Sequence, residues 1–424
     1  MNEAVYEEEE GSGPELLVEL LSSENCMLDT VDLRPSTFTS SDIRNVMLPL
    51  ITSDSIRELY LPLDRIDTVC AKTIVMMMKN NVGPPIEVLH LSDLPTEEQM
   101  EAELKREISS TIISSLKQNK KIKKLLITPQ AVLHQSIPSS IATILYDNTV
   151  LKSLILRGCG ISHVGATKIS CALASNTSIT VLDLSNNSLG KKGIRSVGLA
   201  LELNNTIQKL KLSGTGIGRE GGEAIVEALT VNKSLTVLDM GRNSLDDLVV
   251  TKLARSLKLN TSLRQLSLRS NSFSTIGALC LSFALYDSTN LQTVIECNHT
   301  LQYLDIDSNQ LSRECILRTN KPLRWNALSS TENEIVRKKV SSFLMKSESN
   351  CFYFRDYFGD KKTAQHLIPN VLWSMSNSST VLYYLVKNLA VHSIIATSCL
   401  DVPPVKKSSF DSIFSLNNTG SEYA

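Results

Sequence analysis

A unit that recurs every 28 residues dominates the sequence. Segments with the pattern Leu-x-x-Leu-x-Leu begin at Leu151, Ile179, Ile207, Leu235 and Leu263, so the four intervals are each 28 residues. Another copy begins at Leu301, after the ten-residue insertion Leu291–Thr300. Such periodicity is typical of a solenoid, in which each unit packs only against its neighbours. Whether the insertion forms a lid is left open by the pattern.

Each unit begins with a predicted strand. Leu182 and Leu184 alternate with Val181 and Asp183, which predicts one buried face and one exposed face that includes Asp183. The ninth position is mostly asparagine, at Asn187, Asn243, Asn271 and Asn309, with Cys159 and Thr215 as variants. A side-chain amide there can bond to the backbone of a turn, so we predict a ladder of stacked asparagines.

The second half of each unit is predicted to be helical. Apolar residues lie four apart, as in Ile169 and Leu173, and they define one buried face. An asparagine closes each helix, at Asn176, Asn204, Asn232 and Asn260. Because asparagine tolerates the left-handed conformation of a helix C-terminus, we expect that conformation at these positions.

Weaker copies start at Leu28, Ile56, Ile86 and Ile122. We therefore predict an acidic N-terminal tail and helical cap over residues 1–27, with the helix at 14–22, and about ten repeats over 28–311. Residues 312–330 look polar and irregular, and Thr331–Glu334 resembles a capping box. The range 312–400 reads either as a helical C-terminal cap or as a small interaction module anchored by Trp373, Tyr383 and Tyr384. Residues 401–424 read as a disordered tail.

Units of 28 residues with strand and helix halves, closing on Ala-Leu-x-x-Asn, resemble the ribonuclease-inhibitor type of leucine-rich repeat. The resemblance implies an α/β solenoid of horseshoe shape, with a parallel sheet on its concave face and helices on its convex face. It also implies that the concave face binds another protein.

Composition narrows the class further. The formal net charge is −1, so nothing in the overall charge favours nucleic acid or an anionic membrane. The nine cysteines are dispersed, which indicates reduced thiols. The acidic N-terminus does not resemble a signal peptide, and no apolar run is long enough to span a membrane. We expect a protein of the cytoplasm or the nucleus.

No pattern of residues predicts catalysis, a metal site or a cofactor. The segment Gly216–Gly221 reads Gly-x-Gly-x-x-Gly, but Gly221 is the repeat glycine that also recurs at Gly165, Gly193 and Gly277, and a solenoid lacks a dinucleotide crevice. The six histidines are dispersed. A basic run includes Lys117, Lys121 and Lys123, and it is either a solvated repeat junction or an import signal or anion patch.

The candidate binding residues are those expected on the exposed side of the strands. They are Arg157, Asp183, Lys209, Lys211, Asp239, Arg242, Arg264, Arg269, Tyr303 and Asp305. The repeat spacing makes Asp183, Lys211 and Asp239 neighbours across three strands. They form either a structural row of surface charges or a charged patch that selects a partner.

The function predicted from these observations is that of a non-catalytic protein-binding scaffold. The alternative is a GTPase-activating protein for a Ran-like small GTPase, since that family uses the same class of repeat. Its acidic stretch follows the repeats, however, whereas the acidic run here, Glu7–Glu10, precedes them. A direct ribonuclease inhibitor is disfavoured, because such inhibitors are strongly acidic and rich in cysteine.

Overall fold

The computed structural model describes residues 13–23, 26–80, 83–93, 99–129, 136–289, 291–311 and 313–329, and positions 331, 335–336, 338–339 and 342. Within these residues, one sheet of ten parallel strands follows chain order from β1 to β10. The strands are β1 (Thr30–Asp32), β2 (Glu58–Pro62), β3 (Val88–Asp93), β4 (Lys124–Pro129), β5 (Ser153–Ile155), β6 (Val181–Asp183), β7 (Lys209–Lys211), β8 (Val237–Asp239), β9 (Gln265–Ser267) and β10 (Tyr303–Asp305).

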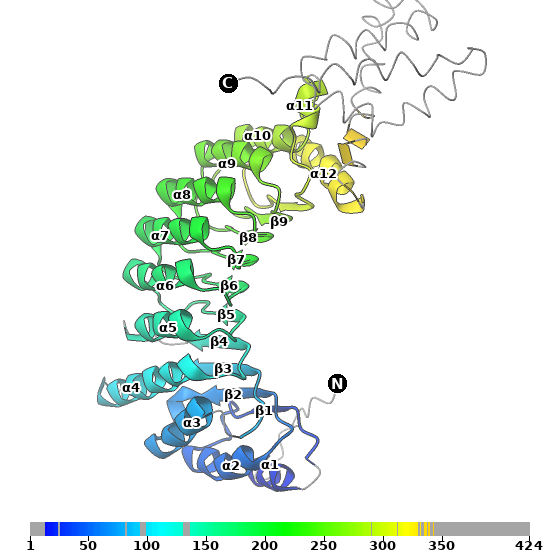
Figure 1. Ribbon diagram of the computed structural model, residues 1–424. Helices are drawn as coiled ribbons and strands as arrows, with labels where there is room; N and C mark the ends of the chain where they lie inside the picture. Colours follow the sequence, from blue (N-terminus) through cyan, green and yellow to red (C-terminus); the bar gives the residue numbers. More distant parts are fainter. Residues whose placement is uncertain are drawn as a thin grey trace, which may run out of the picture. The chain divides into compact units, whose positions relative to one another are not determined.

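A helix layer covers the other side of the stack. The strands line the inner side of the curve of residues 13–339, and the helices line the outer side (Figure 1), as the resemblance to leucine-rich repeats implies. The helices are α1 (Gly13–Ser22), α2 (Ser40–Thr52), α3 (Thr68–Asn80), α4 (Gln99–Ser115), α5 (Ser136–Asp147), α6 (His163–Ser175), α7 (Gly190–Leu203), α8 (Gly218–Val231), α9 (Asp247–Leu259), α10 (Thr275–Leu285), α11 (Leu291–Ile295) and α12 (Arg313–Leu328), with 3-10 turns η1 (Leu63–Arg65) and η2 (Leu116–Gln118).

The core lies between the two layers and is almost entirely aliphatic. The register pairs equivalent leucines of successive repeats, so that Leu182 is aligned with Leu154 and Leu210. Each of these leucines is fully buried. Helices can approach closely because glycine recurs in their first turn: a Cβ added at Gly193 would lie 3.0 Å from the Cβ of Ala166. The 28-residue period thus places every apolar position beside its own copy.

The predicted asparagine ladder is present at the turns that follow the strands. Asn243 Nδ2 donates to Leu212 O of the preceding repeat at 2.8 Å, and its Oδ1 accepts from Thr215 N at 2.9 Å. Asn187 and Asn271 make equivalent bonds. Each amide therefore joins two repeats through groups that would otherwise be buried without partners.

The expectation for the asparagines at the helix ends is wrong. Asn204 has φ −82° and ψ 125°, which is extended and not left-handed, and Asn176, Asn232 and Asn260 share this conformation. The extended backbone turns the side chain inward, where it bonds to backbone groups of its own and the preceding repeat. These residues form a second ladder, which also includes Asn119, Asn148, Asn298 and Asn326.

The expectation of irregular structure at 312–330 is also wrong, because α12 occupies Arg313–Leu328. Its buried residues are Thr319, Pro322, Leu323 and Asn326, and two of these four are polar. Asn326 Nδ2 lies 3.5 Å from Asn298 O, the helix-end position 28 residues earlier, and donates to Leu301 O at 2.7 Å, so this helix follows the repeat pattern. A stripe in which polar side chains are buried through hydrogen bonds cannot be recognised from hydrophobicity alone.

The insertion Leu291–Thr300 lies in the helix layer. It contains the short α11, and Val294 and Cys297 are buried. After it, Asn298 occupies the helix-end position and donates from Nδ2 to Leu257 O at 2.7 Å. The extra residues are thus accommodated before the ladder resumes.

The chain divides into two compact units, residues 1–339 and 340–424. Apart from Ser342, the second unit lies outside the described residues, as do Trp373, Tyr383, Tyr384 and the predicted tail at 401–424. The proposed capping box also lies outside them, except for Thr331. The domain boundaries at residues 27, 311 and 400 stay predictions.

Candidate protein-binding surface

The strand register brings together the three charged residues predicted to be neighbours. Asp183 is aligned with Lys211, and Lys211 with Asp239. Lys211 Nζ lies 3.8 Å from Asp183 Oδ2. The predicted exposure of Asp183 is wrong, because the residue is only 6% exposed. Its Oδ1 accepts a hydrogen bond from Ser185 N at 2.9 Å, which holds the carboxylate over its own turn.

Asp239 and Asp305, the other two aspartates among the candidate binding residues, also stabilise the turns that follow them. Asp239 Oδ1 accepts from Gly241 N at 2.9 Å, and Asp305 Oδ1 accepts from Asp307 N at 3.1 Å. This two-residue spacing is the Asx-turn, in which a carboxylate caps the backbone that follows it. The aspartates are therefore partly structural, which the sequence pattern did not reveal.

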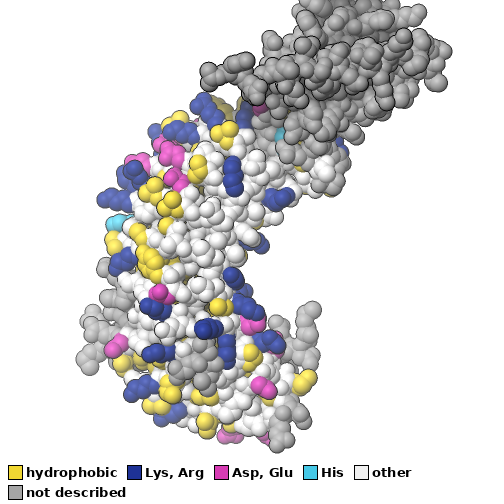
Figure 2. Space-filling view, viewed as in Figure 1, with side chains coloured by type: hydrophobic (Ala, Val, Ile, Leu, Met, Phe, Trp, Pro, Cys, Tyr) yellow, Lys and Arg dark blue, Asp and Glu magenta, His cyan; other side chains and the backbone are white. Residues whose placement is uncertain are grey.

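The basic candidate residues, unlike Asp183, are exposed to solvent. Lys209 and Lys211 are exposed on β7, and Arg157, Arg242, Arg264 and Arg269 are exposed beside β5, β8 and β9. Lys and Arg side chains recur along the strand-bearing edge of the stack (Figure 2). Of these residues and the neighbouring Lys152, Lys211 alone has an ion pair with a described residue. Tyr303 is 57% exposed at the start of β10.

Arg242 has an unusual backbone conformation. Its φ is +55°, and the equivalent repeat positions are Gly158, Asn186, Gly214, Ser270 and Ser308, which also have positive φ. Glycine and asparagine tolerate this left-handed region, whereas a long side chain is strained there by about 1 kcal/mol. The backbone N–H of Arg242 donates to Arg269 O at 2.8 Å, whereas its exposed side chain makes no hydrogen bond or ion pair with the described residues.

The N-terminal strands carry charges that neutralise one another. Arg57 lies 3.5 Å from Asp29 and 3.7 Å from Glu87, and Lys123 Nζ lies 2.7 Å from Glu87. Each of these residues directly precedes its strand, from β1 to β4, as Lys152 directly precedes β5. Charge is therefore balanced at this end of the inner face.

A second polar cluster, which the sequence reading missed, crosses β1 to β4. Arg34 bonds to both oxygens of Asp32, its guanidinium lies 4.3 Å from the centre of the Tyr60 ring, and its Nη1 lies 3.2 Å from His90 Nδ1. His90 Nε2 lies 2.7 Å from Thr128 Oγ1. Because arginine can only donate, His90 Nδ1 accepts and its Nε2 carries the proton.

Electrostatics fits this tautomer. Burial, followed by the charge of Arg34, holds the pKa of His90 below its ordinary value, so the ring is neutral. Burial raises the pKa of Asp32, but the hydrogen bonds from Arg34 outweigh it, and the pKa lies below its ordinary value. The cluster is internally satisfied, and only an alignment of the N-terminal repeats by position could have indicated it.

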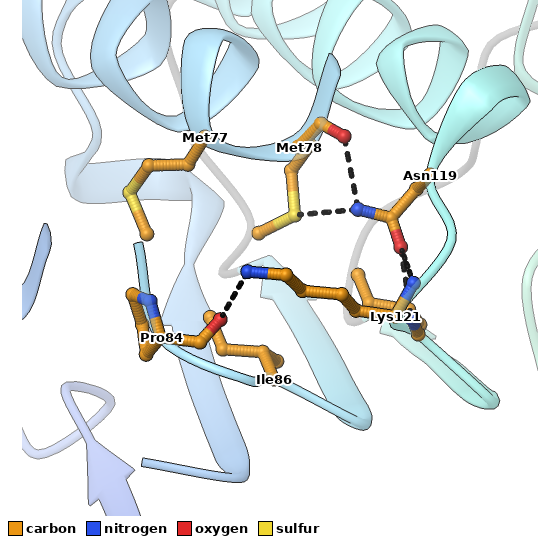
Figure 3. A pocket seen from close by; sticks show the side chains of 7 residues that line it. Met77, Met78, Pro84, Ile86, Asn119 and Lys121 are labelled. Atoms are coloured by element: carbon orange, nitrogen blue, oxygen red, sulfur yellow. Dashed lines mark hydrogen bonds between the residues drawn. The ribbon is translucent and has the colours of Figure 1, made fainter. Parts of the chain in front are cut away.

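The basic run is largely engaged within the stack. Lys121 Nζ donates to Gly83 O at 2.8 Å and to Pro84 O at 3.3 Å. The bond to Pro84 is drawn in Figure 3, beside a small pocket that Met77 and Met78 also line. The pocket has room for about one water molecule. Lys117 pairs with Asp147, and Lys123 with Glu87. These contacts favour the interpretation of the run as a repeat junction.

The described residues contain no cluster of three or more His, Cys, Asp or Glu arranged to hold a metal ion. No helix among them has the length and apolarity to cross a bilayer. Six cysteines are free thiols, namely Cys26, Cys70, Cys159, Cys171, Cys280 and Cys297. Gly216 and Gly218 of the Gly-x-Gly-x-x-Gly segment have positive φ in the turn that leads into α8.

Comparison with protein families supports the repeat assignment. The family model described as "Leucine Rich repeat" matches residues 147–170, 175–198, 203–226, 259–282 and 297–314. These matches cover five repeat segments, and together with the parallel strand-and-helix stack they show that this part of the chain folds as a leucine-rich-repeat solenoid. Comparison with curated proteins gives no match.

Three solved structures are similar to the chain, with low TM-scores and low sequence identity. "Leiomodin-1 Actin-Binding Site 2" is 16% identical, with 50% of this chain and 98% of that chain covered and a TM-score of 0.32. The tropomodulin C-terminal domain of Caenorhabditis elegans is 19% identical, with coverages of 45% and 92% and a TM-score of 0.29. The Rad7 and Elc1 complex of yeast is 13% identical, with coverages of 71% and 84% and a TM-score of 0.35.

Proposed function

We propose that the chain is a non-catalytic protein-binding scaffold that uses the inner face of β5 to β10. The observation that carries this proposal is a set of exposed basic side chains without described ion-pair partners, together with the exposed Tyr303, on a preformed sheet. Arginine and tyrosine are enriched in binding hot spots, and a rigid sheet loses little conformational freedom on binding.

We further propose the ribonuclease-inhibitor type of repeat and a place in the cytoplasm or the nucleus. The 28-residue units support the ribonuclease-inhibitor type of repeat, and the composition supports a place in the cytoplasm or the nucleus. No described residue gives specific support to the alternative of GTPase activation. A small GTPase bound at the inner face would bring that alternative forward.

Charge reversal on the inner face is expected to abolish partner binding. The test variant carries Lys209→Glu, Arg242→Glu and Arg264→Glu. The matched control carries Lys192→Glu, Arg195→Glu and Arg255→Glu, which change the same net charge on exposed positions of α7 and α9. Both variants and the parent chain are used for affinity capture from native lysate, after circular dichroism has established equal folding. A protein retained by the parent and the control but lost with the test variant supports the proposal. Equal capture by all three chains contradicts it.

Removing the strain at Arg242 separates binding from stability. Arg242→Gly is expected to raise the free energy of unfolding by about 0.5–1 kcal/mol, because glycine accepts positive φ, while weakening capture of the partner. Ser270→Gly changes the equivalent position, where φ is also +55°, without removing a cation. It should leave capture unchanged. If Arg242→Gly captures the partner as well as the parent chain does, Arg242 does not contribute to binding.

A further inference from the structure

We propose that the inner face of β5 to β9 binds a polypeptide segment that combines acidic with apolar side chains. This inference rests on the proposed function and specifies the chemistry of the partner.

The local charge is strongly unbalanced. The five nine-residue strand-and-turn segments that begin at residues 151, 179, 207, 235 and 263 contain seven basic and two acidic side chains. The basic residues are Lys152, Arg157, Lys209, Lys211, Arg242, Arg264 and Arg269. The whole chain has a formal net charge of −1, so the excess belongs to this face and not to the overall composition. Complementary charge across an interface selects partners and accelerates their encounter.

The two acidic side chains offset only part of the basic charge. Asp183 is buried over its own turn, and Asp239 Oδ1 accepts from Gly241 N. The ion pair in these segments, Lys211 with Asp183, is long at 3.8 Å. At β1 to β4, by contrast, Glu87 pairs with basic residues of both neighbouring repeats. The chain thus balances charge on one part of its inner face and leaves it unbalanced on the next.

Apolar side chains lie between the cations. Ile155, Val181 and Val237 are half-buried on β5, β6 and β8, at strand positions that alternate with fully buried leucines. Val237 is aligned with Lys209 of the neighbouring strand. A polypeptide can cover such a surface with apolar side chains while its carboxylates reach the rim. A phosphate backbone would satisfy the cations but leave these apolar side chains without partners, so the mixed surface favours a protein segment over nucleic acid.

Fluorescence anisotropy on the full chain tests the inference. The probes are a labelled peptide with alternating Glu and Leu, the same peptide with Gln in place of Glu, and a labelled single-stranded oligonucleotide. We expect the Glu peptide to bind at least about tenfold more tightly than the Gln peptide, and to weaken about tenfold from 50 to 300 mM NaCl because salt screens the charges. Lys209→Glu with Arg264→Glu should weaken binding of the Glu peptide about tenfold, whereas Lys192→Glu with Arg255→Glu should not.

If the glutamate variant does not fold, Lys209→Gln with Arg264→Gln gives the same test. This milder variant is expected to bind the Glu peptide about threefold more weakly than the parent chain. Equal binding of the Glu and Gln peptides would overturn the inference. So would tighter binding of the oligonucleotide, or equal weakening by the helix-layer control. If none of the peptides binds while capture from lysate still depends on the inner face, the protein-binding function is supported. The proposed acidic chemistry of the partner is then contradicted.

Discussion

Replacing Asn204 with alanine is expected to lower the free energy of unfolding by about 3–5 kcal/mol. The side chain is 2% exposed and serves four backbone groups, which are Leu173 O, Asn176 O, Thr206 N and Ile207 N. Alanine would remove all four bonds from a buried position, and each loss costs about 1 kcal/mol. Leu173 O and Asn176 O each keep a second donor, Asn176 N and Thr206 Oγ1. Guanidinium unfolding followed by circular dichroism measures the change.

The adjacent residue provides a matched control. Asn205 is exposed, and its side chain makes one long bond, of 3.4 Å, to Leu203 O. Asn205→Ala should change the free energy of unfolding by less than about 0.5 kcal/mol. Equal effects of the two substitutions would show that the helix-end ladder does not hold neighbouring repeats together.

The C-terminal end of the stack is expected to lose stability continuously as the pH falls from 10 to 4. Lys339 is fully buried, and its Nζ donates to Asn298 O at 2.5 Å and to His299 Nδ1 at 3.1 Å. Burial lowers the pKa of Lys339 from 10.5 to about 7. Burial, followed by the charge of Lys339, lowers the pKa of His299 from 6.5 to about 4.

Both shifts act in the same direction. Between pH 10.5 and 7 the unfolded chain binds a proton at Lys339 that the folded chain does not bind, so acidification favours unfolding. Between pH 6.5 and 4 the same holds for His299. The loss of stability from the Lys339 titration is expected to be on the order of 5 kcal/mol. Asn298 O is also 3.5 Å from Asn326 Nδ2, so Lys339 completes the bonding at the end of the helix-end ladder.

Trp325 in α12 reports on this end of the stack, since its ring lies edge-on to Tyr286 at 5.4 Å. In a Trp373→Phe background, the Trp325 fluorescence is followed during denaturation at each pH. Lys339→Met should remove the change above pH 7 and keep the change below pH 6.5, whereas Lys338→Met should leave the whole profile intact. A profile of the parent chain that is flat from pH 10 to 7 would contradict the burial of Lys339.

The repeat period predicted much of the fold. Strand positions, the parallel order and the turn ladder follow from spacing, because a solenoid places each residue beside its own copy one repeat away. The helix-end ladder could not be predicted in the same way. The recurrence of Asn176 and Asn204 was visible, but whether their backbone is left-handed or extended depends on carbonyl groups of the preceding repeat. The buried stripe of α12 could not be predicted from hydrophobicity for a related reason. Asn326 is polar, and it is buried because it forms a hydrogen bond.

The position of the candidate surface could be predicted from the sequence, but the exposure and the hydrogen bonds of its charged side chains could not. Periodicity placed Asp183 and Lys211 on neighbouring strands, yet it could not show that Asp183 bends back onto Ser185 N. An aspartate at this position caps its turn or faces solvent according to local backbone geometry, which residue type does not encode. Tyr60 and His90 occupy the same position of neighbouring repeats, but the contacts of Arg34 with both rings depend on side-chain geometry that the period does not encode.

Site-specific photo-crosslinking tests the inner-face proposal most directly. A benzophenone amino acid replaces Gln265, which is exposed on β9 and carries no charge, or Arg195, which is exposed on α7. Irradiation in native lysate should give one defined crosslinked protein from position 265 and none from position 195. A defined product from position 195 with none from position 265 would place the partner on the helix layer and contradict binding at the inner face.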